Sequence, residues 1–174
     1  MARYVLVDGT NLLYRAYHAI QGLRTSTGLP TQAVYGLATM VLKALREQAP
    51  DGIAVVFDAP GPTQRHAAYA EYKANREETP EDLKPQVPYA LKLLEAMGVP
   101  VLQVPGVEAD DVLGTLATRL AGEGHEVWIV TGDKDFCQLV SDRIRLLDTM
   151  RDRITDPDAV RERFGVGPGR IVDL

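Results

Sequence analysis

Short apolar runs alternate along the chain with longer segments in which apolar residues recur every three or four positions. The runs at 4–7, 53–57, 99–104 and 127–130 are rich in Val, Ile and Leu, which is typical of buried strands. The segments between them have the periodicity of amphipathic helices. Because strands and helices alternate throughout, the pattern predicts an α/β fold with a doubly wound, mainly parallel sheet flanked by helices.

The helix boundaries follow from capping residues and breakers. Thr79 suits an N-cap and Pro80 a first helical position, although Pro88 lies inside the same pattern and can kink it. A fifth strand is expected at 143–147, with 152–155 pairing in a small hairpin. Helices are expected at 12–20, 31–49, 79–97 and 157–164, with shorter ones at 133–140 and from 169. A further helix is expected from the 108–111 cluster to an end near Gly122 or Gly124.

The bulk composition is that of one soluble domain. The 174 residues, with 45% hydrophobic and 25% charged positions, suffice for a substantial core. No apolar run has the length of a membrane span, and no signal peptide precedes the first strand, so no membrane association is expected. Cys137 is the single cysteine and is expected as a packed thiol, which suits a reducing cytoplasm.

Carboxylates follow each of the four predicted strands. Because the carboxyl ends of parallel strands share one edge of a sheet, these side chains are expected to converge on one site. Acidic residues are also common at ordinary helix starts, where free N–H groups favour negative charge. A capped helix start is therefore the alternative for the central Glu-Ala-Asp-Asp stretch. The set comprises Asp8, Asp58, Glu108, Asp110, Asp111, Asp133 and Asp135.

Seven converging carboxylates require cations. Two unit charges about 4 Å apart repel by roughly 4 kcal/mol at an effective dielectric constant of 20. A cluster of oxygen ligands without His or Cys suits Mg²⁺ or Mn²⁺ better than Zn²⁺. The sequence therefore predicts a site of the kind that two-metal phosphodiester chemistry needs.

The net charge of −5 does not argue against a phosphate-rich partner. Seven of the 24 acidic residues belong to the cluster, and the remaining 17 face 19 Lys and Arg. Bound divalent ions would neutralise the cluster, so the net charge argues neither for nor against a phosphate-rich partner.

A basic and aromatic stripe follows the second strand. Helical spacing places Arg65, Tyr69, Tyr72 and Arg76 on one side, with Lys73 beside them. Arg and Lys there could hold phosphates while Tyr stacks on a base. The alternative is a solvated helix face whose tyrosines lie on a neighbouring element. The same two alternatives apply to Arg15, near the end of the first strand.

With these features together, the sequence resembles the 5′ nuclease (flap endonuclease-like) domain of bacterial DNA polymerase I, within the PIN-like superfamily. The similarity is collinear over the whole chain. It rests on 6–9, 14–19, 55–59, Arg65 with 72–76, 106–111 and 131–135.

The resemblance implies Mg²⁺- or Mn²⁺-dependent 5′ to 3′ exonuclease and structure-specific 5′-flap endonuclease activity on DNA, as in replication and repair. It implies two ions: the first held by Asp8, Asp58, Glu108, Asp110 and Asp111, directly or through water, and the second by Asp133 and Asp135. Lys73, Arg76 and Asp110 would act at the reacting phosphate. Residues expected to contact DNA are Arg15, Arg65, Tyr69, Tyr72, Lys73 and Arg76.

The resemblance also sets expectations for domain organisation. Residues 1–174 correspond to the N-terminal part of the nuclease domain, with a helical arch at about 63–97. A further aspartate pair and a helix–hairpin–helix element, which the family carries beyond this point, are absent from the sequence. A monomer is expected, and the sequence leaves open whether the full-length protein carries a polymerase domain.

Two other readings of the sequence remain open. Asp8-Gly9-Thr10 matches part of the D-x-D-G-T strand end of haloacid dehalogenase-type phosphatases, but Leu6 stands where the nucleophilic Asp would be. The second is a non-catalytic DNA-binding module, against which the intact acidic cluster argues. Cleavage of a 5′-flap substrate with and without Mg²⁺ separates all three.

Overall fold

The computed structural model describes residues 1–69, 71 and 78–173, and these are built around a six-stranded sheet. The strand order is β3-β2-β1-β4-β5-β6, parallel except for β6, which pairs antiparallel with β5. The strands are β1 (Arg3–Asp8), β2 (Gly52–Val56), β3 (Val101–Leu102), β4 (Glu126–Val130), β5 (Ile144–Asp148) and β6 (Arg153–Thr155).

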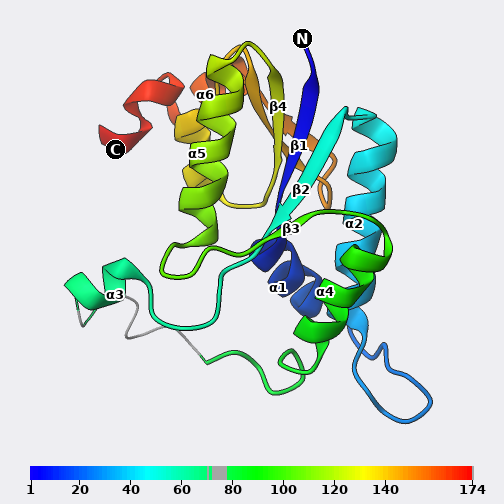
Figure 1. The fold of residues 1–174 in the computed structure, drawn as a ribbon. Helices are drawn as coiled ribbons and strands as arrows, with labels where there is room; N and C mark the ends of the chain where they lie inside the picture. Colours follow the sequence, from blue (N-terminus) through cyan, green and yellow to red (C-terminus); the bar gives the residue numbers. More distant parts are fainter. Residues whose placement is uncertain (70, 72–77, 174) are drawn as a thin grey trace.

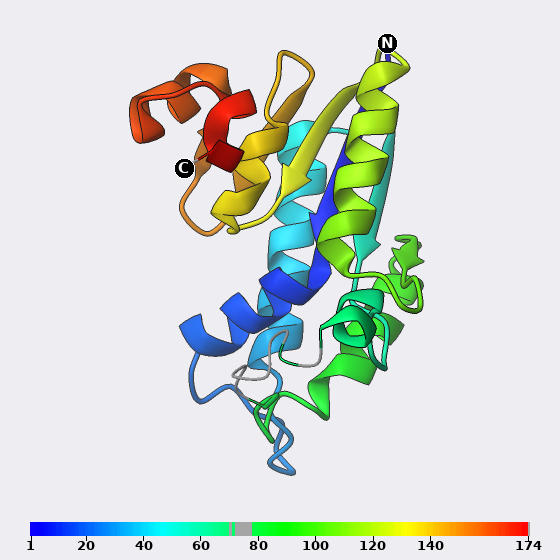
Figure 2. The same cartoon turned by 90° about the vertical axis from the view of Figure 1, so that its left-hand side faces the viewer.

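Helices cover both faces of the sheet (Figures 1 and 2). One face packs against α1, α2 and α4, and the other against α5, α6 and η1. The α-helices are α1 (Gly9–Ala19), α2 (Gln32–Gln48), α3 (Gln64–Ala68), α4 (Gln86–Ala96), α5 (Ala109–Gly122) and α6 (Pro157–Phe164). The 3₁₀ helices are η1 (Lys134–Leu139) and η2 (Pro168–Asp173).

The two-sided core follows from the alternation of side chains along each strand. In β1, Val5 and Val7 join the core beneath α1 and α2, while Leu6 joins the core beneath α5. All three are buried because the sheet is covered on both faces. The predicted doubly wound α/β architecture is confirmed.

The fourth helix is shorter than the sequence pattern suggested. It begins at Gln86 rather than near Thr79, and Pro85 rather than Thr79 is its N-cap. Residues 81–85 form turns instead, in which Leu83 donates its N–H to the Pro80 carbonyl. Pro85 disfavours helical geometry in the residue before it. Pro88 therefore falls in the first turn of α4, where its missing N–H breaks no helical hydrogen bond.

Other elements differ mainly in length and type. The third strand is limited to β3, because Pro100 cannot donate to the sheet and the chain turns away after Leu102. The expected helices at 133–140 and from 169 are the 3₁₀ segments η1 and η2. The β5–β6 hairpin, the helix α6 and the burial of Cys137 are confirmed. Of the segment predicted as a helical arch, α3 and α4 are described, and α4 packs on the sheet. Tyr72, Lys73 and Arg76 lie outside the described residues.

Within the described residues, no helix is long and apolar enough to cross a membrane.

The strand order determines where the acidic residues meet. β3, β2, β1 and β4 are adjacent and parallel, so their carboxyl ends lie along one edge. The connections diverge between β1 and β4: α1 leaves toward one face, and α5 leads into β4 from the other. Such a switch point is where ligands bind in open α/β sheets.

The contact between α1 and α2 gives a test of the packing. A Cβ added at Gly36 would lie 2.4 Å from the Cβ of Ala16, so Gly36→Ala must push the helices apart. We expect a loss of about 1–3 kcal/mol in the free energy of unfolding, measured by urea denaturation.

Gly122→Ala is the matched control, because nothing lies within 4 Å of a Cβ added there. It should be neutral or stabilising by up to about 1 kcal/mol, since Ala is the better helix former. Equal effects of the two substitutions would show that α1 and α2 do not meet as described.

Candidate active site

Three carboxylates gather at the start of α5. Glu108 is the N-cap, and Asp110 and Asp111 lie in the first turn. One carboxylate oxygen from each lies within 4.8 Å of the others. The Asp111 N–H donates to Oδ1 of Asp110 at 2.8 Å. The helix N-terminus favours negative charge, but one helix end offsets only part of the repulsion among three acids.

Asp58 contacts the start of α5 from the end of β2. It follows β2 and accepts a hydrogen bond from the N–H of Ala109 at 2.8 Å. Its own N–H donates to Oγ1 of Thr10 at 2.9 Å. Asp58 thereby connects the end of β2 to the beginnings of α1 and α5.

Asp8 lies at the centre of the edge and is buried. It is the N-cap of α1, accepting hydrogen bonds from the Asn11 N–H at 3.2 Å and the Thr131 hydroxyl at 2.9 Å. Burial raises the pKa of Asp8 to about 6, and the charges of Asp133 and Asp58 add to this effect. Acids from both sides therefore act on Asp8, which a bound cation would stabilise in its ionised form.

Asp133 and Asp135 lie on the segment that follows β4. The Asp135 N–H donates to Oδ1 of Asp133 at 2.9 Å, and the Asp133 N–H donates to Oγ1 of Thr131 at 3.1 Å. The Gly132 N–H donates to Oδ1 of Asn11 at 3.0 Å. The side chains of Asn11 and Thr131 therefore hold this segment against the end of β1.

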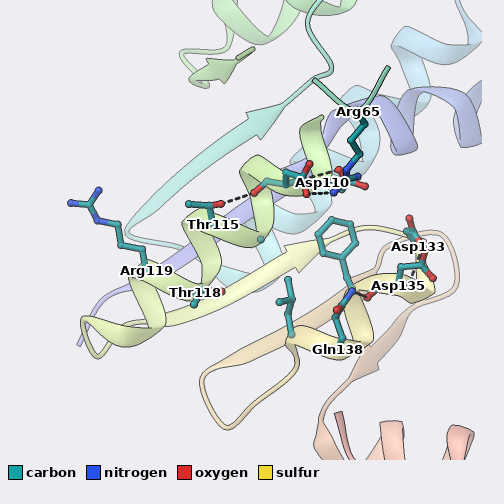
Figure 3. A pocket seen from close by; sticks show the side chains of 12 residues that line it. Arg65, Asp110, Thr115, Thr118, Arg119, Asp133, Asp135 and Gln138 are labelled. Carbon is teal, nitrogen blue, oxygen red and sulfur yellow. Dashed lines mark hydrogen bonds and ion pairs between the residues drawn. The ribbon is translucent and has the colours of Figure 1, made fainter. Parts of the chain in front are cut away.

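Two groups of acids, Asp110 with Asp111 on α5 and Asp133 with Asp135 beside η1, line a common open groove with a volume of about 770 Å³. Figure 3 shows Asp110 and Arg65 at one end, Asp133 and Asp135 on the wall formed by η1, and Arg119 farther along α5. The lining residues are Arg65, Asp110, Asp111, Gly114, Thr115, Thr118, Arg119, Asp133, Asp135, Phe136, Gln138 and Leu139.

The predicted acids thus occupy one edge of the sheet but do not form one tight cluster. Among the described residues, Glu108, Asp110 and Asp111 form the compact set. The remaining predicted acids, Asp8, Asp58, Asp133 and Asp135, lie outside that set.

The predicted DNA-contacting residues are placed differently from one another. Arg65 lines the groove, whereas Tyr69 at the end of α3 is 73% exposed and is absent from its lining. Tyr72, Lys73 and Arg76 lie outside the described residues, so the structure does not place them. Their roles stay predictions.

Arg15 is largely enclosed beneath the second group of acids. Its Nη2 donates to both carboxylate oxygens of Asp148 at 3.1 Å, and its Nη1 is buried without a hydrogen-bond partner among the described residues. A Cβ added at Gly132 would lie 2.2 Å from that Nη1, so the guanidinium packs directly against the segment carrying Asp133. In this structure Arg15 supports the site from below, and DNA contact by Arg15 stays a prediction.

Asn11, Thr131 and Asp148 were missed by the sequence reasoning. Each has a polar side chain at or just beyond the end of a parallel strand, as the predicted acids do. That position was a usable signal, but the prediction covered only carboxylates that follow the first four strands, which leaves out the polar side chains of Asn11 and Thr131 and the fifth strand with Asp148.

The donor set fits hard divalent cations. Every predicted ligand supplies a carboxylate oxygen, and the compact set spans distances that a single ion can bridge. Burial, with the charges of Asp133 and Asp58, raises the pKa of Asp8, so a nearby cation would favour its ionised form. A divalent ion supplies that positive charge.

Comparison with known proteins agrees with this geometry. Residues 3–165 match the family model described as 5′-3′ exonuclease, N-terminal resolvase-like domain. The chain belongs to this family.

Curated relatives of this 5′-3′ exonuclease domain include polymerases and a separate exonuclease. The chain is 54% identical over 174 residues to DNA polymerase I of Pseudomonas aeruginosa, covering 99% of the chain and 19% of that protein. It is 39% identical over 173 residues to a 5′-3′ exonuclease of Aquifex aeolicus, covering 99% of the chain and 60% of that protein. The chain therefore spans about a fifth of the length of the polymerase relative.

Solved structures share the fold of this exonuclease domain. A T5 protein co-crystallised with metal ions superposes with a TM-score of 0.77 at 21% identity, covering 99% of this chain and 65% of that one. The bacteriophage T5 flap endonuclease, in a pseudo-enzyme-product complex with DNA and metal ions, has a TM-score of 0.71 at 22% identity, covering 94% and 61%. The PIN-like architecture of the chain is thereby confirmed.

The buried Asp8 carboxyl gives a pH-dependent test. Its pKa is about 6 in the folded chain and near 4 when unfolded, so its contribution to stability is present below pH 4 and is lost as pH rises through 6. Asp8→Asn cannot ionise. In EDTA, the free energy of unfolding of Asp8→Asn should therefore rise by roughly 1–3 kcal/mol relative to that of the parent between pH 4 and pH 8.

Urea denaturation at both pH values measures this difference. Asp142→Asn, at an exposed position away from the groove, is the control and should show little pH dependence. A parent chain that loses no stability relative to Asp8→Asn between these pH values would contradict the burial of a charged Asp8.

Proposed function

We propose that this chain is a divalent-metal-dependent 5′ nuclease that hydrolyses DNA phosphodiester bonds as a 5′ to 3′ exonuclease and 5′-flap endonuclease. The observation that carries the proposal is the meeting of two groups of carboxylates in one open groove at the switch point of the sheet. Family membership supports it, because relatives include a 5′-3′ exonuclease and DNA polymerase I.

Two Mg²⁺ or Mn²⁺ ions would use the two groups of acids. Glu108, Asp110 and Asp111 would hold the first ion with help from Asp8 and Asp58, directly or through water. Asp133 and Asp135 would hold the second ion. When bound, the ions would polarise the phosphodiester and lower the pKa of the attacking water.

The remaining predicted residues would orient the nucleic acid. Lys73 and Arg76 would bind the reacting phosphate and favour the charge that develops in the transition state. Arg65 would contact phosphate at the mouth of the groove, where its side chain is 47% exposed. Tyr69 and Tyr72 would stack on bases of the single-stranded 5′ end.

The proposal also covers the substrate, the accompanying domain, the oligomeric state and the cellular compartment. The substrate would be DNA with a 5′ flap or 5′ end, in keeping with the DNA present in the T5 flap endonuclease complex. A polymerase domain would accompany the nuclease in the full-length protein, as in the polymerase relatives. We propose a monomer acting in the cytoplasm, an environment that suits the buried free thiol of Cys137.

The direct test of the function uses Asp110. Asp110→Ala should abolish Mg²⁺-dependent cleavage of a labelled 5′-flap substrate, because it removes a carboxylate from the compact set. The stability of the metal-free protein should hold or rise, because one of several crowded like charges is gone. Gel analysis of cleavage products and thermal denaturation in EDTA measure the two effects.

Asp156→Ala is the matched control for this test. Asp156 caps α6 through a 2.8 Å hydrogen bond from the Ala159 N–H, on a helix that contributes no residue to the groove. This variant should lose about 0.5–2 kcal/mol of stability and retain cleavage. Normal cleavage by Asp110→Ala, or its unfolding, would refute the assigned role. Turnover of small phosphoesters without DNA cleavage would favour a phosphatase instead.

Lys73 provides a second test, based on the sequence alone. Lys73→Ala should slow single-turnover cleavage at saturating enzyme, because a positive charge that favours the transition state is lost. Lys92→Ala, at an exposed position on α4, is the control and should leave the rate unchanged. An unchanged rate for Lys73→Ala would instead favour the alternative that the basic stripe is a solvated helix face.

A further inference from the structure

A positively charged side chain already bridges two members of the compact carboxylate set. Nη1 of Arg65 lies 2.7 Å from Oε2 of Glu108, and its Nη2 lies 2.8 Å from Oδ1 of Asp111. Both acids belong to the group that fits a divalent ion. The guanidinium therefore interacts with carboxylates that would be expected to bind the ion.

The position of Arg65 is set by the docking of α3. The Gln64 N–H donates to the carbonyl of Gly106 at 2.9 Å, which attaches the beginning of α3 to the loop leading into α5. Thr63 and His66 form a capping box around the same turn. Figure 3 shows the Arg65 side chain directed toward the start of α5, beside Asp110.

The burial of Glu108 makes its contact with Arg65 more than a surface ion pair, whereas the Asp111 side chain is 43% exposed. The Glu108 side chain is 6% exposed and lies beside two other acids, so its charge is weakly solvated and needs a nearby cation. The Arg65 side chain is 47% exposed and also lines the groove. One part of the guanidinium can thus serve the buried acid while the side chain remains accessible from the groove.

We propose that Arg65 is a counter-ion of the carboxylate site that a divalent metal ion can replace. This proposal rests on the proposed metal-dependent nuclease function. Without metal, Arg65 holds Glu108 and Asp111 in place and limits their repulsion. A divalent ion takes over these oxygens, and the guanidinium is released to bind a phosphate of the substrate. Metal binding and the release of α3 are thereby coupled.

The coupling must be reciprocal. If the ion weakens the contact between Arg65 and the acids, that contact weakens binding of the ion by the same factor. Removing Arg65 should therefore have opposite effects on two properties: the metal-free protein becomes less stable, and its affinity for the ion rises. A residue with a purely structural role would lower stability without improving metal binding.

The test compares the parent with Arg65→Gln, Arg65→Lys and Arg119→Gln. Arg119 lines the same groove but is 78% exposed and pairs with the exposed Glu123, so its substitution controls for the general loss of a positive charge. Calorimetric titration with Mn²⁺ gives the affinity, thermal denaturation in EDTA gives the stability, and amide hydrogen exchange at 64–68 reports the docking of α3.

For Arg65→Gln we expect Mn²⁺ affinity to rise by roughly 3–10-fold and the metal-free melting temperature to fall. Arg65→Lys should lie between this variant and the parent, because an ammonium cannot bridge both acids in the same way. Arg119→Gln should stay within about twofold of the parent affinity. In the parent, Mn²⁺ should increase exchange at 64–68, whereas in Arg65→Gln exchange should be fast without metal.

The proposed role of Arg65 as a counter-ion would be overturned if Arg65→Gln bound Mn²⁺ no more tightly than the parent. The same holds if neither protein bound Mn²⁺. Unchanged exchange at 64–68 on addition of Mn²⁺ to the parent would do the same. Tight Mn²⁺ binding with the expected Arg65 effects, but without DNA cleavage, would instead refute the proposed nuclease function and leave the counter-ion exchange standing.

Discussion

Repulsion among carboxylates at one edge of the sheet is the constraint on which the other features of this structure depend. The order β3-β2-β1-β4 brings four parallel strand ends side by side, and each is followed by acidic residues. The fold offsets the repulsion in several ways. Asp58 accepts an N–H at the start of α5, Arg65 pairs with Glu108 and Asp111, and Asp8 holds its proton more tightly than an ordinary carboxyl.

The two halves of the site are supported differently. The acids of α5 are fixed by a helix start and by α3, which is docked on the preceding loop. Asp133 and Asp135 instead depend on hydrogen bonds to Thr131 and Asn11, with Arg15 packed beneath Gly132. α1 contributes to both halves, because Asp8 is its N-cap and Thr10 contacts Asp58. Displacement of α1 would therefore disturb both groups of acids at once.

The sequence was sufficient to predict the architecture and the edge at which the acids meet. Apolar periodicity gave the buried strands, and parallel topology then required that Asp8, Asp58 and the acids after β3 and β4 share one side. Local chemistry was harder to judge: the fit of Thr79 and Pro80 to a helix start was overridden by Pro85. Arg15 shows why side-chain partners could not be predicted, because Asp148 lies 133 positions away and only the folded chain brings the two together.

The central claim is that these carboxylates form a site for divalent cations, and binding linkage tests it most directly. Unfolding of the intact chain is followed over a range of Mn²⁺ concentrations, with NaCl at matched ionic strength as reference. An ion that binds the native state specifically should raise the free energy of unfolding by about 2.7 kcal/mol at a hundredfold excess over its dissociation constant. Stabilisation by Mn²⁺ that does not exceed that of matched NaCl would contradict the claim.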